Sequence, residues 1–383
     1  AFPLIYHIIQ LSHQLRVLVI GNYLPDQQQS MIRFASLLVS IYGVCGDVTL
    51  KSPRAYFPLL SGLPPFVRKY LAYIDKLLLF PLSLLLSSRS FNLVHIADHS
   101  NAFYAFCFSR QRCIVTCHDL LAVRGAMGDP AASCESSPIG ILLQRLIMAG
   151  LRRADAVVFD SSATLYDYQH LTGIAGDSNK YAVIPIPLNA PFTPDHQAFR
   201  LSSVERAQVP DQPYLLMVGS ALPRKNRALA IKLLIALGAD SDYRLVFAGA
   251  PLTDSEQAFQ RTHTLGSRLI SVSGPSHALL NLLYCQAHAL LFPSFSEGFG
   301  WPLVEAQTCC CPVIASTTTS IPEVAGNGAL YAEPTDVDTF ATHVLALECP
   351  SERERLIRLG LTNIQRYDTV LIGAAYRSFA CQP

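Results

Sequence analysis

The chain has 383 residues, enough for two or three domains with sizeable hydrophobic cores. Its 29 Lys and Arg nearly balance its 28 Asp and Glu, which disfavours nucleic-acid binding by bulk charge as well as an acidic disordered tail. Its 11 cysteines form no C-x-x-C pair and no regular spacing, so we expect reduced thiols and a cytoplasmic protein.

The sequence offers no clear membrane-spanning segment. Although 50% of its residues are hydrophobic, the longest clean apolar run, 77–86, has ten residues, whereas a spanning helix needs about 20. Residues 1–15 carry no charged side chain and lack the basic region that opens a signal peptide. We therefore expect neither a signal peptide nor an anchor there.

Short apolar runs alternate with longer helical patterns along the chain. Each run is nearly continuous in apolar residues, as in parallel strands that are buried on both faces. The runs are 17–20, 48–50, 93–96, 113–116, 156–159 and 182–184 in the first half, and 214–218, 245–248, 270–272, 289–292, 313–315 and 329–331 in the second. Strands that alternate with helices predict an α/β chain of two Rossmann-like domains, which face each other across a cleft.

A proline-rich stretch separates the two halves. Six prolines lie between Pro185 and Pro213, a density that disfavours both a helix and a central strand. The predicted division is a first domain at 1–187, a linker at 188–213, a second domain at 214–365 and a C-terminal helix at 366–383 that crosses back to the first domain.

A basic and apolar stretch lies between Lys51 and Arg89, where six Lys or Arg accompany one Asp. Its apolar residues from Tyr70 to Phe80 form one face with basic flanks. One interpretation is a helix on an anionic membrane, or one that holds a lipid-linked acceptor. The other is an ordinary amphipathic helix that packs on the sheet.

The loops that follow the predicted strands narrow the chemistry. The first strand is followed by 21–25, which is no G-x-G-x-x-G, and no P-loop is present; both facts disfavour nicotinamide dehydrogenases and P-loop enzymes. In the second half, a strand ends at Gly219 and the next loop carries Arg224 and Lys225. Two adjacent cations in a strand-to-helix loop suit phosphate oxygens, and an ordinary surface pair is the alternative.

A second loop, 293–300, follows a buried strand and leads into a helix near Pro302. Its glycines and the helix N-terminus favour an anion. Glu297 in the loop and Glu305 in the helix could bind the paired hydroxyls of a sugar and of a ribose. A capping Glu and a solvated Glu are the alternative.

One histidine in the first half follows a predicted strand. His118 comes directly after the run 113–116 and Cys117, at the edge where ligands of such sheets bind. It could be a general acid or base, or donate a hydrogen bond to a sugar. A structural histidine is the alternative.

These motifs resemble the retaining glycosyltransferases of the GT-B fold, glycosyltransferase family 4. Segment 294–306 is similar to the family motif of two Glu separated by seven residues, and 218–226 to its phosphate-binding segment. Segments 312–315 and 320–324 match the downstream signature. The weaker matches are 116–119 and 154–161. Two positions differ from the usual pattern: Ser220 stands where many relatives have Arg, and Cys310 where they have Gly.

The resemblance implies roles for these residues. Arg224 and Lys225 would bind the diphosphate, Glu297 the transferred sugar and Glu305 the ribose, while His118 would approach the reacting centre. The implied catalytic residues are His118, Glu297, Arg224 and Lys225. The implied donor-binding residues are Gly219, Arg224, Lys225, Ser273, Gly274, Glu297, Gly298, Phe299, Gly300, Trp301, Pro302, Leu303 and Glu305.

The implied activity is retaining transfer of a hexose from a nucleotide-diphosphate sugar, of the GDP-mannose or UDP-sugar type, to a saccharide or lipid-linked acceptor in glycan or polysaccharide biosynthesis. The second domain would bind the donor and the first the acceptor. No cofactor or metal is expected, since the pairs Asp240/Asp242 and Asp336/Asp338 read as chance D-x-D matches. Open alternatives are a sugar-nucleotide epimerase or hydrolase, a non-catalytic sugar-nucleotide-binding scaffold, and a peripheral position on the inner membrane face.

Overall fold

The computed structural model describes residues 15–382 apart from 27, 55–64, 130, 131, 133, 135, 175–178, 189 and 264. The chain divides into two compact units. Unit 1 comprises Ala1–Pro185 and Thr369–Pro383, and unit 2 comprises Ile186–Asp368.

Unit 1 is built on a six-stranded parallel sheet with the strand order β2-β1-β3-β4-β5-β6. Its strands are β1 (Arg16–Ile20), β2 (Asp47–Lys51), β3 (Leu93–Ile96), β4 (Arg112–Cys117), β5 (Ala156–Phe159) and β6 (Tyr181–Val183). All six apolar runs of the first half are strands, as predicted.

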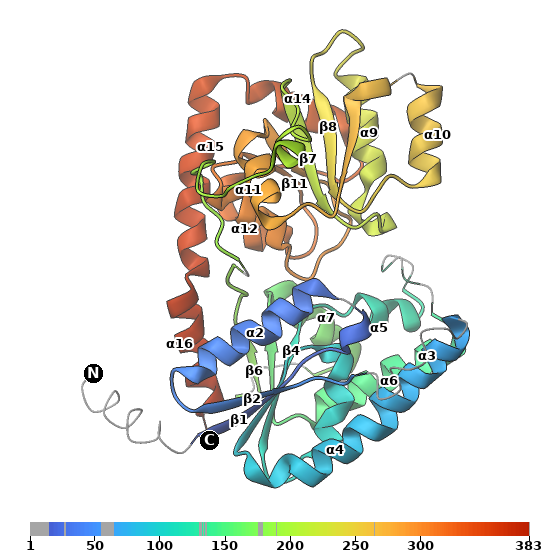
Figure 1. Ribbon diagram of the computed structural model, residues 1–383, viewed down its shortest axis with the longest axis vertical. Coiled ribbons are helices and arrows are strands. Elements are labelled where there is room, and N and C mark those ends of the chain that lie inside the picture. The colour runs from blue at the N-terminus through green and yellow to red at the C-terminus, as the bar shows by residue number, and fades with distance from the viewer. Residues whose placement is uncertain are drawn as a thin grey trace, which may run out of the picture. The chain divides into compact units, whose positions relative to one another are not determined.

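The helices of unit 1 cover both faces of this sheet (Figure 1). They are α2 (Gln29–Gly43), α3 (Pro65–Ile74), α4 (Phe80–Ser87), α5 (Leu121–Ala126), α6 (Pro138–Arg153), α7 (Ser162–Thr172) and α16 (Thr369–Ala380), with the shorter turns η1 (Leu24–Asp26), η3 (Asp75–Leu79), η4 (Ser88–Ser90) and η5 (His99–Cys107). Because strand side chains alternate, Leu18 and Ile20 share one core with α4, η5 and α6. On α2, Phe34 packs on Tyr376 of α16, with ring centroids 6.3 Å apart.

The stretch predicted to be a basic, apolar helix is helical from Pro65 to Ser87, through α3, η3 and α4. Phe80 and Leu84 are buried in the core of unit 1. The window Tyr70–Ser87 is nevertheless only 17% buried, and by length and composition alone it could cross a bilayer, although it contains Asp75 and Lys76. The sequence estimate of ten residues was short because it stopped at those two charges, which do not interrupt the helix.

Unit 2 repeats the plan with the strand order β12-β11-β10-β7-β8-β9, again all parallel. Its strands are β7 (Tyr214–Gly219), β8 (Arg244–Gly249), β9 (Leu269–Ser273), β10 (Ala289–Phe292), β11 (Val313–Ser316) and β12 (Ala329–Ala332). The six runs of the second half are therefore strands as well. The α/β class with two Rossmann-like sheets is confirmed.

The helices of unit 2 are α8 (Ser203–Arg206), α9 (Arg227–Ala236), α10 (Asp254–Thr262), α11 (His277–Gln286), α12 (Trp301–Thr308), α13 (Ile321–Ala325), α14 (Val337–Ala346) and α15 (Pro350–Asn363), with the turns η7 (Pro223–Lys225), η8 (Gly266–Arg268), η9 (Gly326–Gly328) and η10 (Ile364–Tyr367). Figure 1 shows α9 and α14 on one side of this sheet and α11 and α12 on the other.

The segment predicted as a linker, 188–213, lies within unit 2 and contains the short helix α8. Thr193 is held to α11, since its backbone N–H donates to Asn281 Oδ1 over 3.0 Å and its carbonyl accepts from Asn281 Nδ2 over 3.1 Å. Prolines therefore exclude a long helix here without preventing the segment from packing.

Candidate active site

The central strand β7 has neighbours on both sides in unit 2, β10 and β8, so the chain reverses its direction of travel across the sheet there. Ligands of open parallel sheets bind at the carboxyl ends of the strands that flank such a switch point. The loops that follow β7 and β10 carry the two motifs singled out in the sequence.

Three charged side chains from these two loops meet directly. Arg224 Nη1 lies 2.6 Å from Glu297 Oε2, and Lys225 Nζ lies 2.6 Å from Glu297 Oε1. Arg224 also donates to the carbonyl of Ser296 over 3.0 Å. Each oxygen of the Glu297 carboxylate therefore accepts from one cation, which fixes both cations at the mouth of the loop.

The charge state of Glu297 follows from its surroundings. The side chain is only 5% exposed, and burial raises its pKa. Lys225 and Arg224 outweigh burial and hold the pKa below its ordinary value. Glu297 is therefore ionised at neutral pH and neutralises one of the two cations, which leaves the cluster with one net positive charge for an anionic ligand.

The loop that presents Glu297 is tied to the end of β11. The backbone N–H of Glu297 donates to Thr319 Oγ1 over 3.0 Å, while Ser320 Oγ donates to the carbonyls of Glu297 and Phe299. Ser316 Oγ donates to the carbonyl of Ser294 over 2.6 Å. The segment 316–320 thus acts as a hydroxyl clamp that holds this loop in one conformation.

Backbone conformation at two turns makes this arrangement possible. Asn226 has φ 57°, and its side-chain amide donates to the carbonyls of Pro293 and Pro334, so the η7 turn is anchored on the neighbouring loop. Gly300 has φ 100° at the start of α12, where a Cβ would lie 3.1 Å from Leu303 and 3.3 Å from Phe292. Only glycine combines that φ with so close an approach.

Glu305 is held separately, on α12. It is buried, and its Oε2 accepts a hydrogen bond of 2.8 Å from the hydroxyl of Tyr284 on α11. Tyr284 is fully buried; burial and the Glu305 carboxylate raise the pKa of its phenol well above 10. The Tyr284 hydroxyl therefore keeps its proton and orients the carboxylate.

The remaining residues expected in this site are spread along the same edge. Ser273 ends β9, and the N–H of Gly274 donates to the carbonyl of Gly249 at the end of β8, over 2.9 Å. Trp301 Nε1 donates to the carbonyl of Pro187 over 3.2 Å. Leu303 is fully buried, so its side chain contributes packing and only its backbone could serve a ligand. The other expected residues are Gly219 at the end of β7, Gly298 and Phe299 in the Glu297 loop, and Pro302 in the first turn of α12.

His118 lies in unit 1, directly after β4, with both ring nitrogens engaged. Nδ1 is 2.7 Å from Asp160 Oδ2 and Nε2 is 2.8 Å from the carbonyl of Ala97. Burial lowers the pKa of this imidazole, but Asp160 and Asp98 raise it to about 9. Since both partners are acceptors, His118 donates from both nitrogens and carries a positive charge at neutral pH.

Several residues of these two centres were not assigned a role from sequence. The sequence could have placed Asp160 near His118. Asp160 follows β5 as His118 follows β4, and neighbouring parallel strands end at the same edge. Thr319 and Ser320 lie next to the matched segment 320–324. Nothing in the sequence links Tyr284 to Glu305, since that contact depends on how α11 packs beside α12.

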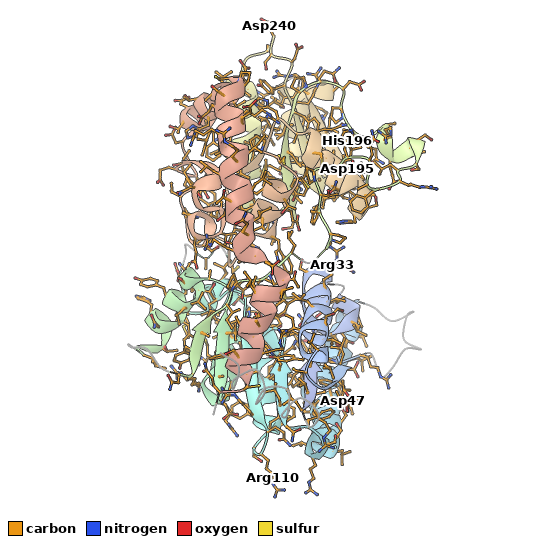
Figure 2. The ribbon with its side chains drawn as sticks, turned by 90° about the vertical axis from the view of Figure 1, so that its left-hand side faces the viewer. Arg33, Asp47, Arg110, Asp195, His196 and Asp240 are labelled. Carbon is orange, nitrogen blue, oxygen red and sulfur yellow. The ribbon has the colours of Figure 1, made fainter. Side chains whose placement is uncertain are left out.

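The two D-x-D matches differ in position: Asp240 and Asp242 lie at the amino edge of the sheet, whereas Asp336 follows β12 at the same edge as the site, with its side chain engaged in capping α14. Asp336 caps α14, where it accepts from the N–H of Thr339 over 3.0 Å. Asp240 and Asp242 precede β8, and Figure 2 shows Asp240 at the far tip of unit 2. Within the residues that the structure describes, no three His, Cys, Asp or Glu side chains gather as they would around a metal.

Comparisons with known proteins agree with this geometry. Residues 201–360 match the family model described as "Glycosyl transferases group 1". The match lies entirely within unit 2. The matched range includes the Arg224, Lys225 and Glu297 cluster as well as Tyr284 and Glu305.

Curated proteins similar to this chain include mannosyltransferases. The O-antigen chain mannosyltransferase B of Escherichia coli is 30% identical over 196 residues, which cover 50% of this chain and 51% of that protein. The O-antigen chain mannosyltransferase RfbU of Salmonella typhimurium is 33% identical over 138 residues, 35% of this chain and 38% of that one. The chain thus spans about half or less of the length of these relatives.

Solved structures share the fold along nearly the whole chain. Sucrose-phosphate synthase from Thermosynechococcus elongatus gives a TM-score of 0.72 at 18% identity and covers 96% of this chain and 100% of that one. The Anabaena HepE structure in complex with UDP and glucose gives 0.69 at 15% identity and covers 95% and 98%. The GT-B glycosyltransferase fold expected from the motifs is confirmed.

The position that departs from the family glycine has a measurable consequence. Cys310 follows α12 with φ 57°, a left-handed conformation that costs a non-glycine residue about 1–2 kcal/mol. Glycine would remove this cost, but its greater conformational freedom in the unfolded chain offsets about 0.5–1 kcal/mol of the gain. We expect Cys310→Gly to raise the free energy of unfolding by about 0.5–1 kcal/mol, measured by urea denaturation. Cys381→Gly, at an exposed cysteine without a positive φ, should give no gain; equal behaviour of the two variants would contradict this account.

Proposed function

We propose that the protein is a retaining hexosyltransferase that takes a sugar from a nucleoside-diphosphate donor and transfers it to a saccharide or lipid-linked acceptor. The observation that carries the proposal is the cluster of Arg224, Lys225 and Glu297 at the switch point of the sheet, within the range that matches the glycosyl transferases group 1 model. The cluster supplies two cations for a diphosphate and one carboxylate for a sugar within a few ångströms.

The cations would act on the leaving group. As the bond from the sugar to the diphosphate breaks, negative charge grows on the phosphate oxygens, and Arg224 and Lys225 are already held in place by Glu297. Cations that need not reorganise during the reaction stabilise such a transition state most effectively. The N-terminus of α12, which begins at Trp301 with Pro302 next, adds backbone N–H groups of the same polarity.

Retention of configuration would follow a front-face path. A covalent route needs a nucleophilic carboxylate, and both oxygens of Glu297 are occupied by cations at 2.6 Å. Such a carboxylate is a poor nucleophile, because attack would require it to give up both partners. We infer that the leaving diphosphate accepts the acceptor's proton on the same face of the sugar.

Mannose from GDP-mannose is the first donor to test, since two curated proteins similar to this chain are O-antigen mannosyltransferases. A UDP-sugar is the second, because HepE, which shares the fold, was solved with UDP and glucose. We place the reaction in the synthesis of a surface polysaccharide, in the cytoplasm.

The decisive experiment incubates the full chain with GDP-mannose, or with UDP-glucose, and candidate saccharide acceptors. We expect nucleoside diphosphate to be released only when an acceptor is present, and the product to keep the anomeric configuration of the donor by NMR. Release without any acceptor would replace the proposal with a hydrolase or epimerase. Tight donor binding without turnover under any acceptor would replace it with a binding scaffold.

Turnover should not require a metal ion. The positive charge that Mg²⁺ or Mn²⁺ supplies in other transferases would come here from Arg224 and Lys225. We expect the rate of donor turnover to be unchanged in excess EDTA. A loss of activity that Mn²⁺ restores would contradict the prediction and reopen the D-x-D pairs.

Tyr284 provides a test of the ribose role proposed for Glu305. Tyr284→Phe removes the 2.8 Å hydrogen bond to Glu305 Oε2 and leaves the ring in place. The ribose contact is the same in ground and transition states, so we expect donor KM and nucleoside diphosphate Kd to rise about fivefold to tenfold with kcat unchanged. Calorimetric titration and initial rates measure both.

The control for that variant is Tyr214→Phe. Tyr214 is also buried, and its hydroxyl donates over 2.7 Å to the backbone carbonyl of Leu283, not to Glu305. It should lower stability to a similar extent without changing Kd. If both variants weaken binding equally, the effect of Tyr284 is a loss of packing and not of orientation.

We further propose that unit 1 contacts an anionic membrane through the helix Pro65–Ser87. Tyr70, Leu78 and Leu82 are each at least half exposed on it, and the window Tyr70–Ser87 is only 17% buried. Apolar side chains exposed on a helix with Lys and Arg nearby are typical of segments that lie in the membrane interface. A peripheral position there would bring the enzyme close to a lipid-linked acceptor.

A further inference from the structure

A groove of about 540 Å³ lies along the second half of α6 in unit 1, outside the centres described above. Its apolar lining includes Phe106, Met127 and Met148. Its lining also includes three cations, Arg145, Arg152 and Arg153. Apolar side chains beside three guanidinium groups match a ligand that joins an anionic group to an apolar chain.

The arginines of this groove are not closely paired with carboxylates among the residues that the structure describes. Neither Arg145 nor Arg152 forms a salt bridge with any residue that the structure describes, and both are exposed. Arg153 donates to the carbonyl of Phe108 over 2.8 Å, and its Nη1 reaches Asp155 only at 4.0 Å. Figure 2 shows Arg110, which precedes β4, pointing outward from the end of unit 1. The positive charge is therefore available to a ligand or surface.

The surface around the groove is apolar. Phe106 and Met127 are each 53% exposed, and the outer face of α6 exposes Ile139, Leu142 and Leu146. Helices α4 and α6 both pack against η5 in one core cluster, so the exposed leucines of α4 lie on the same side of the sheet. Exposed apolar area on two neighbouring helices marks an interaction surface and not scattered surface residues.

We propose that this groove seats the phosphate of an anionic membrane phospholipid. Arg145 and Arg152 would fork onto the phosphate oxygens while Phe106, Met127 and the leucines of α6 enter the acyl boundary. The proposal deepens the membrane contact of the proposed function by naming the lipid class and the residues that select it.

The position of the groove separates it from the transfer chemistry. Helix α6 ends at Arg153, three residues before β5 begins, so Arg152 and Arg153 lie at the amino edge of the sheet. His118 follows the carboxyl end of β4, at the opposite edge. A phospholipid seated in the groove would therefore hold the enzyme on the membrane without occupying the edge where His118 lies.

A second copy of the chain is the less favourable occupant. A two-fold interface centred on this groove would place the arginines of one copy close to those of the other. Like charges opposed across an interface destabilise it. An anionic bilayer carries charge of the opposite sign, and each Lys or Arg near its surface strengthens the attraction.

The test is flotation of the full chain with two kinds of vesicle, phosphatidylcholine alone and phosphatidylcholine with phosphatidylglycerol. We expect binding to the anionic vesicles only, released by salt. The double variant Arg145→Glu/Arg152→Glu should lower the partition coefficient about tenfold or more. Its control, Arg33→Glu/Arg358→Glu, makes the same change in net charge at exposed arginines on α2 and α15, and should lower it by less than about twofold.

Each other outcome overturns the proposal. If both double variants lowered the partition coefficient equally, the attraction would depend on net charge and not on the groove. If the α6 variant left the partition coefficient unchanged, the groove would play no part in binding. If the wild type bound neutral vesicles equally well, apolar insertion by itself would explain the binding. Competition by glycerol phosphate would indicate a free phosphorylated ligand, and dissociation of a dimer by the variant would indicate a second copy.

The proposed function is tested apart from this. Flotation needs no donor, and turnover of the α6 double variant on a water-soluble saccharide acceptor should equal that of the wild type. If the wild type turns over no sugar nucleotide while the vesicle pattern holds, the transferase proposal fails and the phospholipid seat stands.

Discussion

Replacing Glu297 by Ala is expected to lower kcat about 100-fold or more, which corresponds to about 2.7 kcal/mol of transition-state stabilisation. The carboxylate would touch the transferred sugar where positive charge develops, and it also holds Arg224 and Lys225 at 2.6 Å. Both effects matter most when the bond to the diphosphate is breaking. Steady-state rates at saturating donor measure the loss.

The same variant should bind nucleoside diphosphate at least as tightly as the wild type. Removal of Glu297 leaves the full positive charge of Arg224 and Lys225 to the diphosphate, which offsets the loss of the carboxylate that positions them. Glu305→Ala should behave in the opposite way, with weaker nucleoside diphosphate binding, a raised donor KM and a smaller loss of kcat. This reciprocal pattern distinguishes the two glutamates.

Stability is the control for that comparison. Glu297 is buried and carries two ion pairs, so its removal leaves Arg224 and Lys225 without their carboxylate and costs about 1–3 kcal/mol of folding free energy. Rates must therefore be compared at a temperature where circular dichroism shows both proteins folded. If folded Glu297→Ala keeps near-normal turnover, the motif assignment fails, and the transferase proposal loses its main support.

The strands were predictable because parallel strands buried on both faces need nearly continuous apolar runs, and the runs in this sequence, such as 93–96 and 289–292, coincide with β3 and β10. The Glu297 loop was predictable because its glycines and Pro302 are local requirements of a strand-to-helix turn. What joins these segments was not predictable. Lys225 meets Glu297 across 72 residues, and that pairing exists only once β7 and β10 are neighbours.

Local patterns also misled in one place. The apolar residues Tyr70 to Phe80 read as a single face, yet Phe80 is buried in the core while Tyr70 and Leu78 are exposed. Helical spacing indicates which residues share a side, but not how much of that side the rest of the unit covers. Exposure on α6 was likewise invisible, because Ile139 and Leu142 look like core residues in the sequence.

Asp160→Asn is expected to reverse the pH dependence of stability that His118 gives to the wild type. The pKa of His118 in the folded protein is about 9, above the ordinary value of 6.5. A raised pKa contributes stability that is fully present below pH 6.5 and is lost as the pH rises to about 9, here up to about 3 kcal/mol. Urea denaturation across this interval measures the slope.

Asparagine at position 160 changes which group of the pair donates the hydrogen bond. Its side-chain amide can donate to a neutral Nδ1 while Nε2–H still donates to the carbonyl of Ala97. With the Asp160 charge gone, burial lowers the pKa of His118, so the stability loss between pH 6.5 and 9 should shrink and a new loss should appear below pH 6.5. His99 also feels the charges of Asp160 and His118, but the variant keeps Asp98, the hydrogen-bonded carboxylate that raises the pKa of His99, so the difference between the two profiles reports chiefly His118.

Asp160→Ala separates the lost charge from the lost partner. Alanine leaves the buried imidazolium without its hydrogen-bonded counter-ion, and breaking a buried pair in this way costs about 3–5 kcal/mol. The asparagine variant should cost less, because a donor replaces the acceptor that a neutral His118 no longer needs. If wild type and Asp160→Asn show the same slope between pH 6.5 and 9, His118 is neutral in the folded protein, and its assignment as a fixed cation at the end of β4 is wrong.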